Sequence, residues 1–182
     1  MSFKAYLNDE SCAMIDCIVK SYDIKNSQRY KALDHVILLQ GFSCDSKKFD
    51  SLIQAIKKEP VLQLVGVRFV KLRHKQYANN AQQLVMLQFE AHNCVKSEIE
   101  DIAICCRIQH HLPYITLGKI KQDAMNSFSM FAKYSFSVNI DVEKTLLSLK
   151  TLMSSTYQQE ANENGLTTML KWYDIFYEFR TK

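Results

Sequence analysis

The chain has 182 residues, enough for one ordinary domain or for a domain of two small lobes, and long enough to bury a sizeable core. Its hydrophobic fraction of 47% and charged fraction of 23% are those of a folded protein and argue against extensive disorder. The net charge of +4 permits an anionic ligand without requiring one.

The six cysteines show neither C-x-x-C spacing nor a partnering histidine pattern, so they predict neither a zinc site nor a disulfide framework. We therefore expect reduced, mostly buried thiols, with no metal and no other cofactor. The N-terminus lacks a charged segment followed by an apolar run, and no apolar stretch approaches the length that spans a bilayer. These features predict a cytoplasmic protein without a membrane partner.

Helix and strand signals alternate along the chain. Apolar residues recur at helical spacing over residues 9–21, and the run 33–42 is nearly continuously apolar, as in a strand buried on both faces. Asp45 and Ser46 can cap the next helix. Pro60 ends this helix. The elements expected after it are strands at 62–72 and 83–91 joined by a long basic loop, a helix at 95–108, a strand at 113–119, a short helix at 122–133 and a strand at 136–140.

The last third of the chain is less regular. The leucines between residues 146 and 153 fit a helix or a strand, and residues 158–165 form a polar loop. Aromatic and charged residues alternate from Trp172 to Phe179, which predicts a final strand. In total the elements predict an α+β chain with an approximate internal duplication.

Two of the predicted strands have the same build. His35 stands two positions before Ile37, and Tyr114 stands two positions before Thr116. Because successive side chains of a strand alternate between its faces, the members of each pair face the same way. The two matching strands predict one pocket made by a duplicated unit.

The two segments LDHVILLQGF and LPYITLGKI resemble the two motifs of the two-histidine (2H) phosphoesterases, which include the 2',5'-RNA ligase and cyclic phosphodiesterase proteins. That family carries two copies of His-x-Thr/Ser followed by an apolar residue, each on a strand from one lobe. The separation of the two segments is compatible with the family's spacing. The flanking segments LQLVGVRFV, LVMLQFE, FSVNI and KWYDIFYEF are similar to its middle and closing strands.

This resemblance implies an α+β, two-lobed and duplicated fold, with antiparallel sheets around a central cleft and helices on the outside. Residues 1–182 would form one bilobal domain, with the helix at 9–21 leading into it. The resemblance also implies a metal-independent acid–base reaction on 2',5'-linked or 2',3'-cyclic phosphate nucleotides or RNA ends. One imidazole is the base, the other is the acid, and the hydroxyls hold the phosphate.

Each motif keeps half of its functional pair, since Ile37 stands at one hydroxyl position and Tyr114 at one histidine position. The resemblance implies that His35 is the base and that Thr116 binds phosphate. Tyrosine has an ordinary pKa of about 10, so Tyr114 is a hydrogen-bond donor or a weak acid and a poor base. Lys119, farther along the same strand, is expected on the face of Thr116, where it compensates for the hydroxyl lost at Ile37.

Three functions remain open from the sequence. The first is a phosphodiesterase that uses His35, Tyr114 and Thr116, and the second is an inactive member of the family that binds a nucleotide, an RNA end or a protein. The third is an interaction module whose pocket is filled by side chains such as Ile37. His110 and His111 are interpreted as a pair at a helix end or in a loop, in preference to a replacement for the missing imidazole.

Overall fold

The structure is a computed structural model that describes residues 2–26, 33–41, 46–71, 82–131, 133–134 and 136–151. The chain divides into two compact units, Met1–Thr145 and Leu146–Lys182. The first unit contains all the strands of the described residues. It also contains every residue that the sequence analysis assigns to a site.

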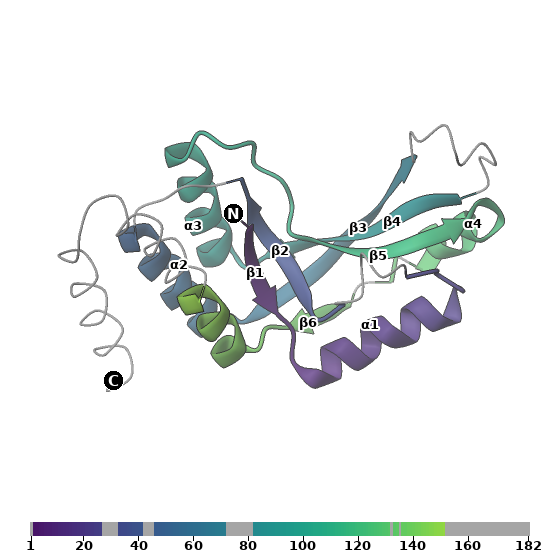
Figure 1. Cartoon of the computed structure of the whole chain (residues 1–182), viewed down its shortest axis with the longest axis horizontal. Coiled ribbons are helices and arrows are strands. Elements are labelled where there is room, and N and C mark those ends of the chain that lie inside the picture. The colour runs from purple at the N-terminus through teal and green to yellow at the C-terminus, as the bar shows by residue number, and fades with distance from the viewer. Residues whose placement is uncertain are drawn as a thin grey trace. The chain divides into compact units, whose positions relative to one another are not determined.

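The described helices and strands alternate much as the sequence predicts (Figure 1). In chain order they are β1 (Ser2–Tyr6), α1 (Asp9–Ser21), β2 (His35–Gln40), α2 (Ser46–Lys58), β3 (Val61–Lys71), β4 (Gln82–Ala91), α3 (Asn93–Cys105), β5 (Tyr114–Lys121), α4 (Gln122–Phe131) and β6 (Ser137–Asn139). Residues 142–151 are also helical, which settles the choice between helix and strand for residues 146–151.

The six strands form one antiparallel sheet in the order β1-β2-β5-β4-β3-β6. The fold is therefore α+β, as predicted, but the described strands belong to a single sheet where the resemblance implied several. The two motif strands, β2 and β5, are neighbours inside this sheet although a helix, a hairpin and another helix separate them in the sequence. A duplicated origin of the two halves stays a prediction.

One face of the sheet is buried and the other is partly open to solvent. Along β4, Val85, Leu87 and Phe89 are fully buried while the residues between them are half-exposed. The helices pack on the buried face: Phe3 of β1 contacts Phe49 of α2, with ring centroids 5.9 Å apart. On the same face, Phe69 of β3 contacts the fully buried Phe128 of α4, with centroids 6.4 Å apart. The opposite face, which we call the open face, is the one that carries the predicted site residues.

The helix bounds follow from local signals. Helix α1 matches the expected range 9–21, and the Asn8 side chain caps it by accepting a hydrogen bond from the Ser11 N–H at 3.0 Å. Helix α3 ends at Cys105 instead of continuing to residue 108, because Arg107 has a left-handed backbone with φ of 53°. The predicted strand from Trp172 to Phe179 and the basic loop at 73–81 lie outside the described residues.

The sequence analysis is wrong on two points. Residues 2–6 form the edge strand β1, which it does not predict, although Phe3 and Ala5 alternate with more polar residues and are buried. The thiols are not mostly buried: of the five described cysteines, two are exposed and three are half-exposed. All five lie on helices or directly after one, and none of them reaches the core; they are Cys12, Cys17, Cys94, Cys105 and Cys106.

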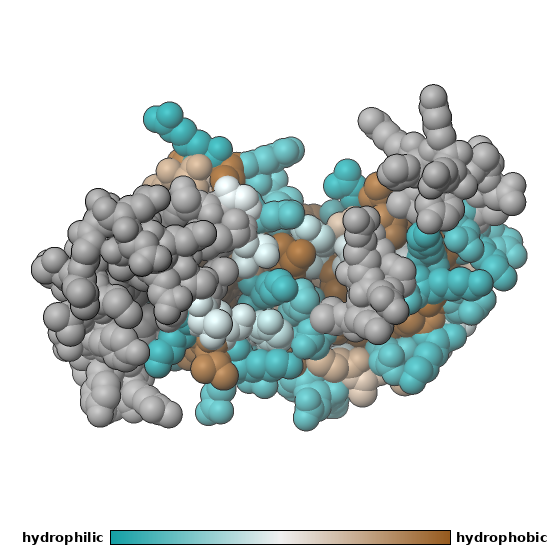
Figure 2. Space-filling model, in the orientation of Figure 1, coloured by the Kyte–Doolittle hydropathy of each residue, from teal (hydrophilic) through white to brown (hydrophobic). Residues whose placement is uncertain are grey.

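The surface of the described residues is mainly hydrophilic in the view of Figure 2, where hydrophobic residues form small, separate patches. In the first unit the large exposed apolar side chains come from different elements, for example Val65 of β3 and Ile104 of α3. Isolated residues of this kind are normal for a protein surface. Among the helices that the structure describes, none is long and apolar enough to cross a membrane.

Candidate functional site

The two motif strands meet at one residue pair. Ile37 of β2 and Tyr114 of β5 are Cα partners, and beyond this pair the two strands diverge (Figure 1). Partners in an antiparallel pair share a face, and so do residues two apart in one strand. His35, Ile37, Tyr114 and Thr116 therefore all belong to the open face, and each is partly exposed there. The structure thus brings the two predicted pairs to one region of the sheet.

Lys119 reaches the same face because β5 is irregular. Thr116 and Lys119 are three residues apart, so a regular strand would direct them to opposite faces. The pairing with β4 shifts by one residue between Val85 and Met86, which places Met86 opposite Thr116 and Leu84 opposite Lys119. Met86 and Leu84 are two apart and share a face. The bulge therefore directs Lys119 to the side of Thr116. The sequence analysis placed Lys119 on this face as in a regular strand, and that reason is wrong because only the bulge brings it there.

Residues 24–26, which precede β2 in the sequence, lie along the part of β5 that β2 does not pair with. Lys25 and Lys119 exchange two backbone hydrogen bonds, of 2.9 and 3.0 Å. This close approach needs a glycine at position 118: a Cβ there would lie 2.6 Å from the Lys25 carbonyl oxygen, and its φ of +143° disfavours other residues. Gly118 thus allows residues 24–26 to continue the sheet beside the site.

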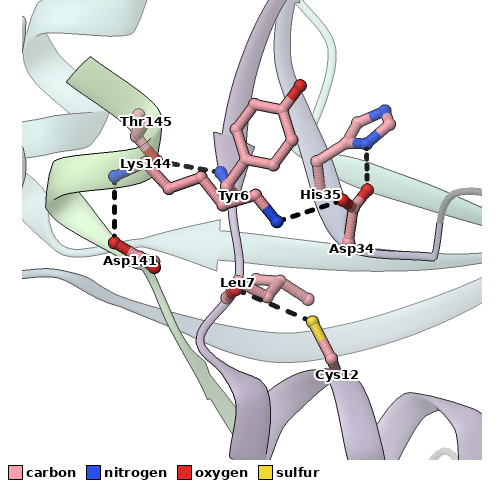
Figure 3. Close-up of polar contacts among 8 residues, drawn as sticks. All are labelled: Tyr6, Leu7, Cys12, Asp34, His35, Asp141, Lys144 and Thr145. Carbon is pink, nitrogen blue, oxygen red and sulfur yellow. Dashed lines mark hydrogen bonds and ion pairs between the residues drawn. The ribbon is translucent and has the colours of Figure 1, made fainter. Parts of the chain in front are cut away.

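His35 is held by a carboxylate. Its Nδ1 lies 2.9 Å from Asp34 Oδ1, and the other oxygen of Asp34 accepts a hydrogen bond from Lys144 Nζ at 3.2 Å (Figure 3). Burial raises the pKa of Asp34, but the hydrogen bonds from His35 and Lys144 outweigh it, so the pKa of this carboxyl lies below its ordinary value. Asp34 is consequently ionised at neutral pH and can only accept hydrogen bonds.

This contact decides the tautomer of His35. Since ionised Asp34 has no proton to donate, Nδ1 of His35 must carry the hydrogen of their hydrogen bond. In the neutral ring Nε2 then carries the lone pair, and Figure 3 shows this second ring nitrogen pointing away from Asp34. The side chain of His35 is 14% exposed, so its ring is largely shielded from water. Within the described part of the chain, Nε2 has no hydrogen-bond partner and is left for a ligand.

Tyr114 is held at both its ring and its hydroxyl. The hydroxyl donates a hydrogen bond to Gln40 Oε1 at 3.0 Å, and burial raises the pKa of the phenol. The ring of His111 lies edge-on against that of Tyr114, with centroids 5.3 Å apart. His110 is exposed in the same connecting segment, residues 108–113. Tyr114 is thus a neutral hydrogen-bond donor whose hydroxyl already has an acceptor.

The sequence analysis missed Asp34, Lys144 and Tyr6. Tyr6 of β1 is the Cα partner of His35, and their rings lie 5.5 Å apart. An acid directly before a histidine was a signal that could have identified Asp34. Lys144 lies 110 residues farther along the chain, and no local pattern connects it with Asp34. Among the described residues, no group of three or more histidine, cysteine, aspartate or glutamate side chains could hold a metal ion.

Together these features define an α+β protein whose antiparallel sheet carries a half-buried aspartate–histidine pair, a tyrosine, a threonine and a lysine on its open face. No protein-family model and no curated protein matches the sequence. The chain is similar to two solved structures of Usb1 from Kluyveromyces marxianus. The first has 13% sequence identity and a TM-score of 0.39, and covers 75% of this chain and 88% of that chain. The second, with uridine monophosphate, has 11% identity and a TM-score of 0.37, and covers 72% and 74%.

Proposed function

We propose that this chain is a 2H phosphoesterase-like protein that acts on nucleotides or RNA ends carrying a 2',5'-linked or 2',3'-cyclic phosphate. The proposal includes a duplicated, bilobal arrangement of residues 1–182, a cytoplasmic location and a reaction without a metal or cofactor. The observation that carries it is the half-buried His35, whose Nε2 is left for a ligand on the face that also bears Thr116 and Lys119.

His35 is the general base of the proposed reaction. Its Nε2 takes a proton from the attacking water, whose oxygen then forms a bond to phosphorus while a ribose oxygen leaves. Asp34 stabilises the imidazolium that forms, since its carboxylate accepts from Nδ1 at 2.9 Å. The Thr116 hydroxyl and the Lys119 ammonium bind the non-bridging phosphate oxygens, which carry the negative charge.

Tyr114 supplies the proton to the leaving oxygen. Burial raises the pKa of this phenol, so it keeps its proton at neutral pH but releases it less readily than an imidazolium would. Its hydroxyl must also leave Gln40 to reach the ligand. Slow turnover is therefore expected, since general acid catalysis typically contributes about 10²- to 10⁴-fold.

The test is incubation of the purified chain with 2',3'-cyclic nucleotides and short 2',5'-oligoadenylates in the presence of EDTA. His35→Ala should lower the rate by about 10²- to 10⁴-fold through loss of the base. The matched control is His92→Ala, because His92 is an exposed histidine at the start of α3. Absence of turnover by the unmodified chain, or an equal rate in the His35→Ala variant, would remove the proposed reaction.

A second candidate is binding without turnover. It is favoured by Tyr114, whose hydroxyl is already bound to Gln40, and by Ile37, which places an apolar side chain where the family has a hydroxyl. In this case a nucleotide or RNA end binds saturably and is recovered intact. Thr116→Val removes only a hydroxyl from a side chain of nearly the same shape, so it should weaken binding about 2- to 10-fold. Multiple turnover of any such ligand contradicts this candidate.

A further inference from the structure

The contacts of His35 extend beyond the groups that the proposed reaction uses. Asp34 Oδ1 accepts from the imidazole and Oδ2 accepts from Lys144 Nζ, so one carboxylate is shared between two bases. Lys144 Nζ also lies 4.9 Å from the centre of the Tyr6 ring, which in turn lies 5.5 Å from the ring of His35. These four side chains, Tyr6, Asp34, His35 and Lys144, form a closed set of contacts that we call the His35 cluster (Figure 3).

The backbone holds Lys144 in place from two sides. Its N–H donates to Asp141 Oδ1 at 3.0 Å at the start of the helix formed by residues 142–151. Next to it, the buried Thr145 accepts a hydrogen bond from the Tyr6 N–H at 2.9 Å, and the Asp141 N–H donates to the Tyr6 carbonyl at 2.8 Å. The start of this helix is thus tied to β1, the strand that pairs with His35.

We propose that Asp34 and Lys144 are positioning residues that control the protonation of His35 in opposite directions. Asp34 holds the hydrogen on Nδ1 and favours the charged ring. Lys144 holds the carboxylate in its ionised form and, as a neighbouring cation, opposes a positive charge on the ring. The catalytic meaning of this assignment rests on the proposed function, but the effect on His35 does not.

The other titratable groups around His35 come from β1, β5, α1 and the segment that leads into the helix at residues 142–151. Tyr6 of β1 packs on the ring of His35, and β5 contributes Tyr114, whose pKa burial raises. Cys12 of α1 lies near Asp34 and Lys144, and its pKa is raised by burial and then by the charge of Asp34. Asp141 is the next carboxylate and bonds to the backbone of Lys144. Among the described residues, Asp34 and Lys144 are the charged members of the His35 cluster, and Asp141 is a further carboxylate next to it.

The experiment is a pH titration of the imidazole signals by NMR on the full chain, with His35 assigned by comparison with His35→Ala. Asp34→Asn removes the negative charge beside Nδ1 and should move the midpoint of the His35 titration to lower pH. Lys144→Met removes the positive charge and should move this midpoint to higher pH. Lys144→Arg keeps the charge and should leave the midpoint close to that of the unmodified chain. Amide spectra of each variant check that the fold is retained.

Shifts of opposite sign support the proposal, because a merely structural role would not separate the two variants in this way. Shifts of the same sign, or no shift in either variant, overturn it. The nitrogen signals of His35 in the unmodified chain give a test that needs no substitution. Protonated Nδ1 and unprotonated Nε2 above the pKa are expected, and the reverse tautomer overturns the assignment.

The same measurements separate this inference from the proposed function, since NMR titration requires no turnover. Opposite shifts in a chain that hydrolyses no phosphodiester leave the His35 cluster in place and remove the proposed reaction. If turnover depends on His35 but the titration of His35 is the same in the Asp34 and Lys144 variants, the inference is overturned and the proposed reaction stands. Where turnover is found, the acidic limb of its pH profile should move down in Asp34→Asn and up in Lys144→Met.

Discussion

The close approach of residues 24–26 to β5 predicts a large loss of stability for Gly118→Ala. The added Cβ would lie 2.6 Å from the Lys25 carbonyl oxygen and 3.1 Å from the Asn26 Cα, and both neighbours are backbone atoms. The φ of +143° adds backbone strain of about 1–3 kcal/mol. Displacing Lys25 also breaks its two hydrogen bonds with Lys119, at about 0.5–1.5 kcal/mol each. We therefore expect a loss of about 2–6 kcal/mol in the free energy of unfolding.

The assay is urea denaturation followed by circular dichroism. Substitutions at two other glycines separate the contribution of backbone strain from that of the close contact. Gly41 has a φ of +80° and nothing within 4 Å of the added Cβ, so Gly41→Ala measures strain alone, at about 1 kcal/mol. At Gly66 the nearest atom would be 4.0 Å away, so Gly66→Ala should be neutral or slightly stabilising. A loss in Gly118→Ala no larger than that in Gly41→Ala would refute the reasoning from close contact.

Three further predictions concern the core, the acid range and a helix end. Phe128→Ala should lower the free energy of unfolding by about 3–5 kcal/mol, because this ring is fully buried, whereas Met130→Ala, at a residue 65% exposed, should change it little in the same denaturation assay. The pKa of Asp34 is lowered in the folded chain, so its contribution of at most about 1 kcal/mol is present above its ordinary pKa and is lost as the pH falls through the lower, folded value. The difference in unfolding free energy between the unmodified chain and Asp34→Asn should therefore shrink from pH 7 to about pH 2, and a difference that grows on acidification would contradict this sign. Asn8→Ala removes the cap of α1 and should cost about 1 kcal/mol, measured as a lower thermal midpoint, whereas an unchanged midpoint would show that the hydrogen bond to Ser11 N–H contributes nothing.

Much of the order of elements follows from local signals in the sequence. Helix α1 begins where Asn8 can cap it, and α2 ends just before Pro60. A capping side chain and a proline without an N–H each affect the backbone hydrogen bonds of only one helical turn, so a short stretch of sequence indicates both helix ends. The hairpin of β3 and β4 was predicted from two neighbouring apolar runs. Strand β1 was missed although Phe3 and Ala5 alternate with more polar residues, and its pairing with β2 is a long-range event that the sequence does not show.

The candidate site depends both on the local sequence and on the pairing of strands in the sheet. From the sequence by itself we identified His35, Tyr114 and Thr116 and placed them on strands, because the alternation of side chains in a strand is a local property. That these two strands are neighbours was decided by the sheet, in which Ile37 meets Tyr114 across a large separation in the chain. The bulge that turns Lys119 toward the face of Thr116 likewise arises from the pairing of β5 with β4.

The chemistry of His35 was decided by one neighbour in the sequence and one distant residue. A histidine in an apolar run has two tautomers, and the sequence does not distinguish them. Asp34 selects one by accepting from Nδ1, and Lys144, 110 residues away, reaches that carboxylate because its helix starts beside β1. The sequence places an acid directly before His35, and the folded backbone brings its carboxylate to Nδ1, which leaves Nε2 for a ligand. Only the tertiary structure brings Lys144 to the same carboxylate, since hydrogen bonds depend on position in space and not on order in the chain.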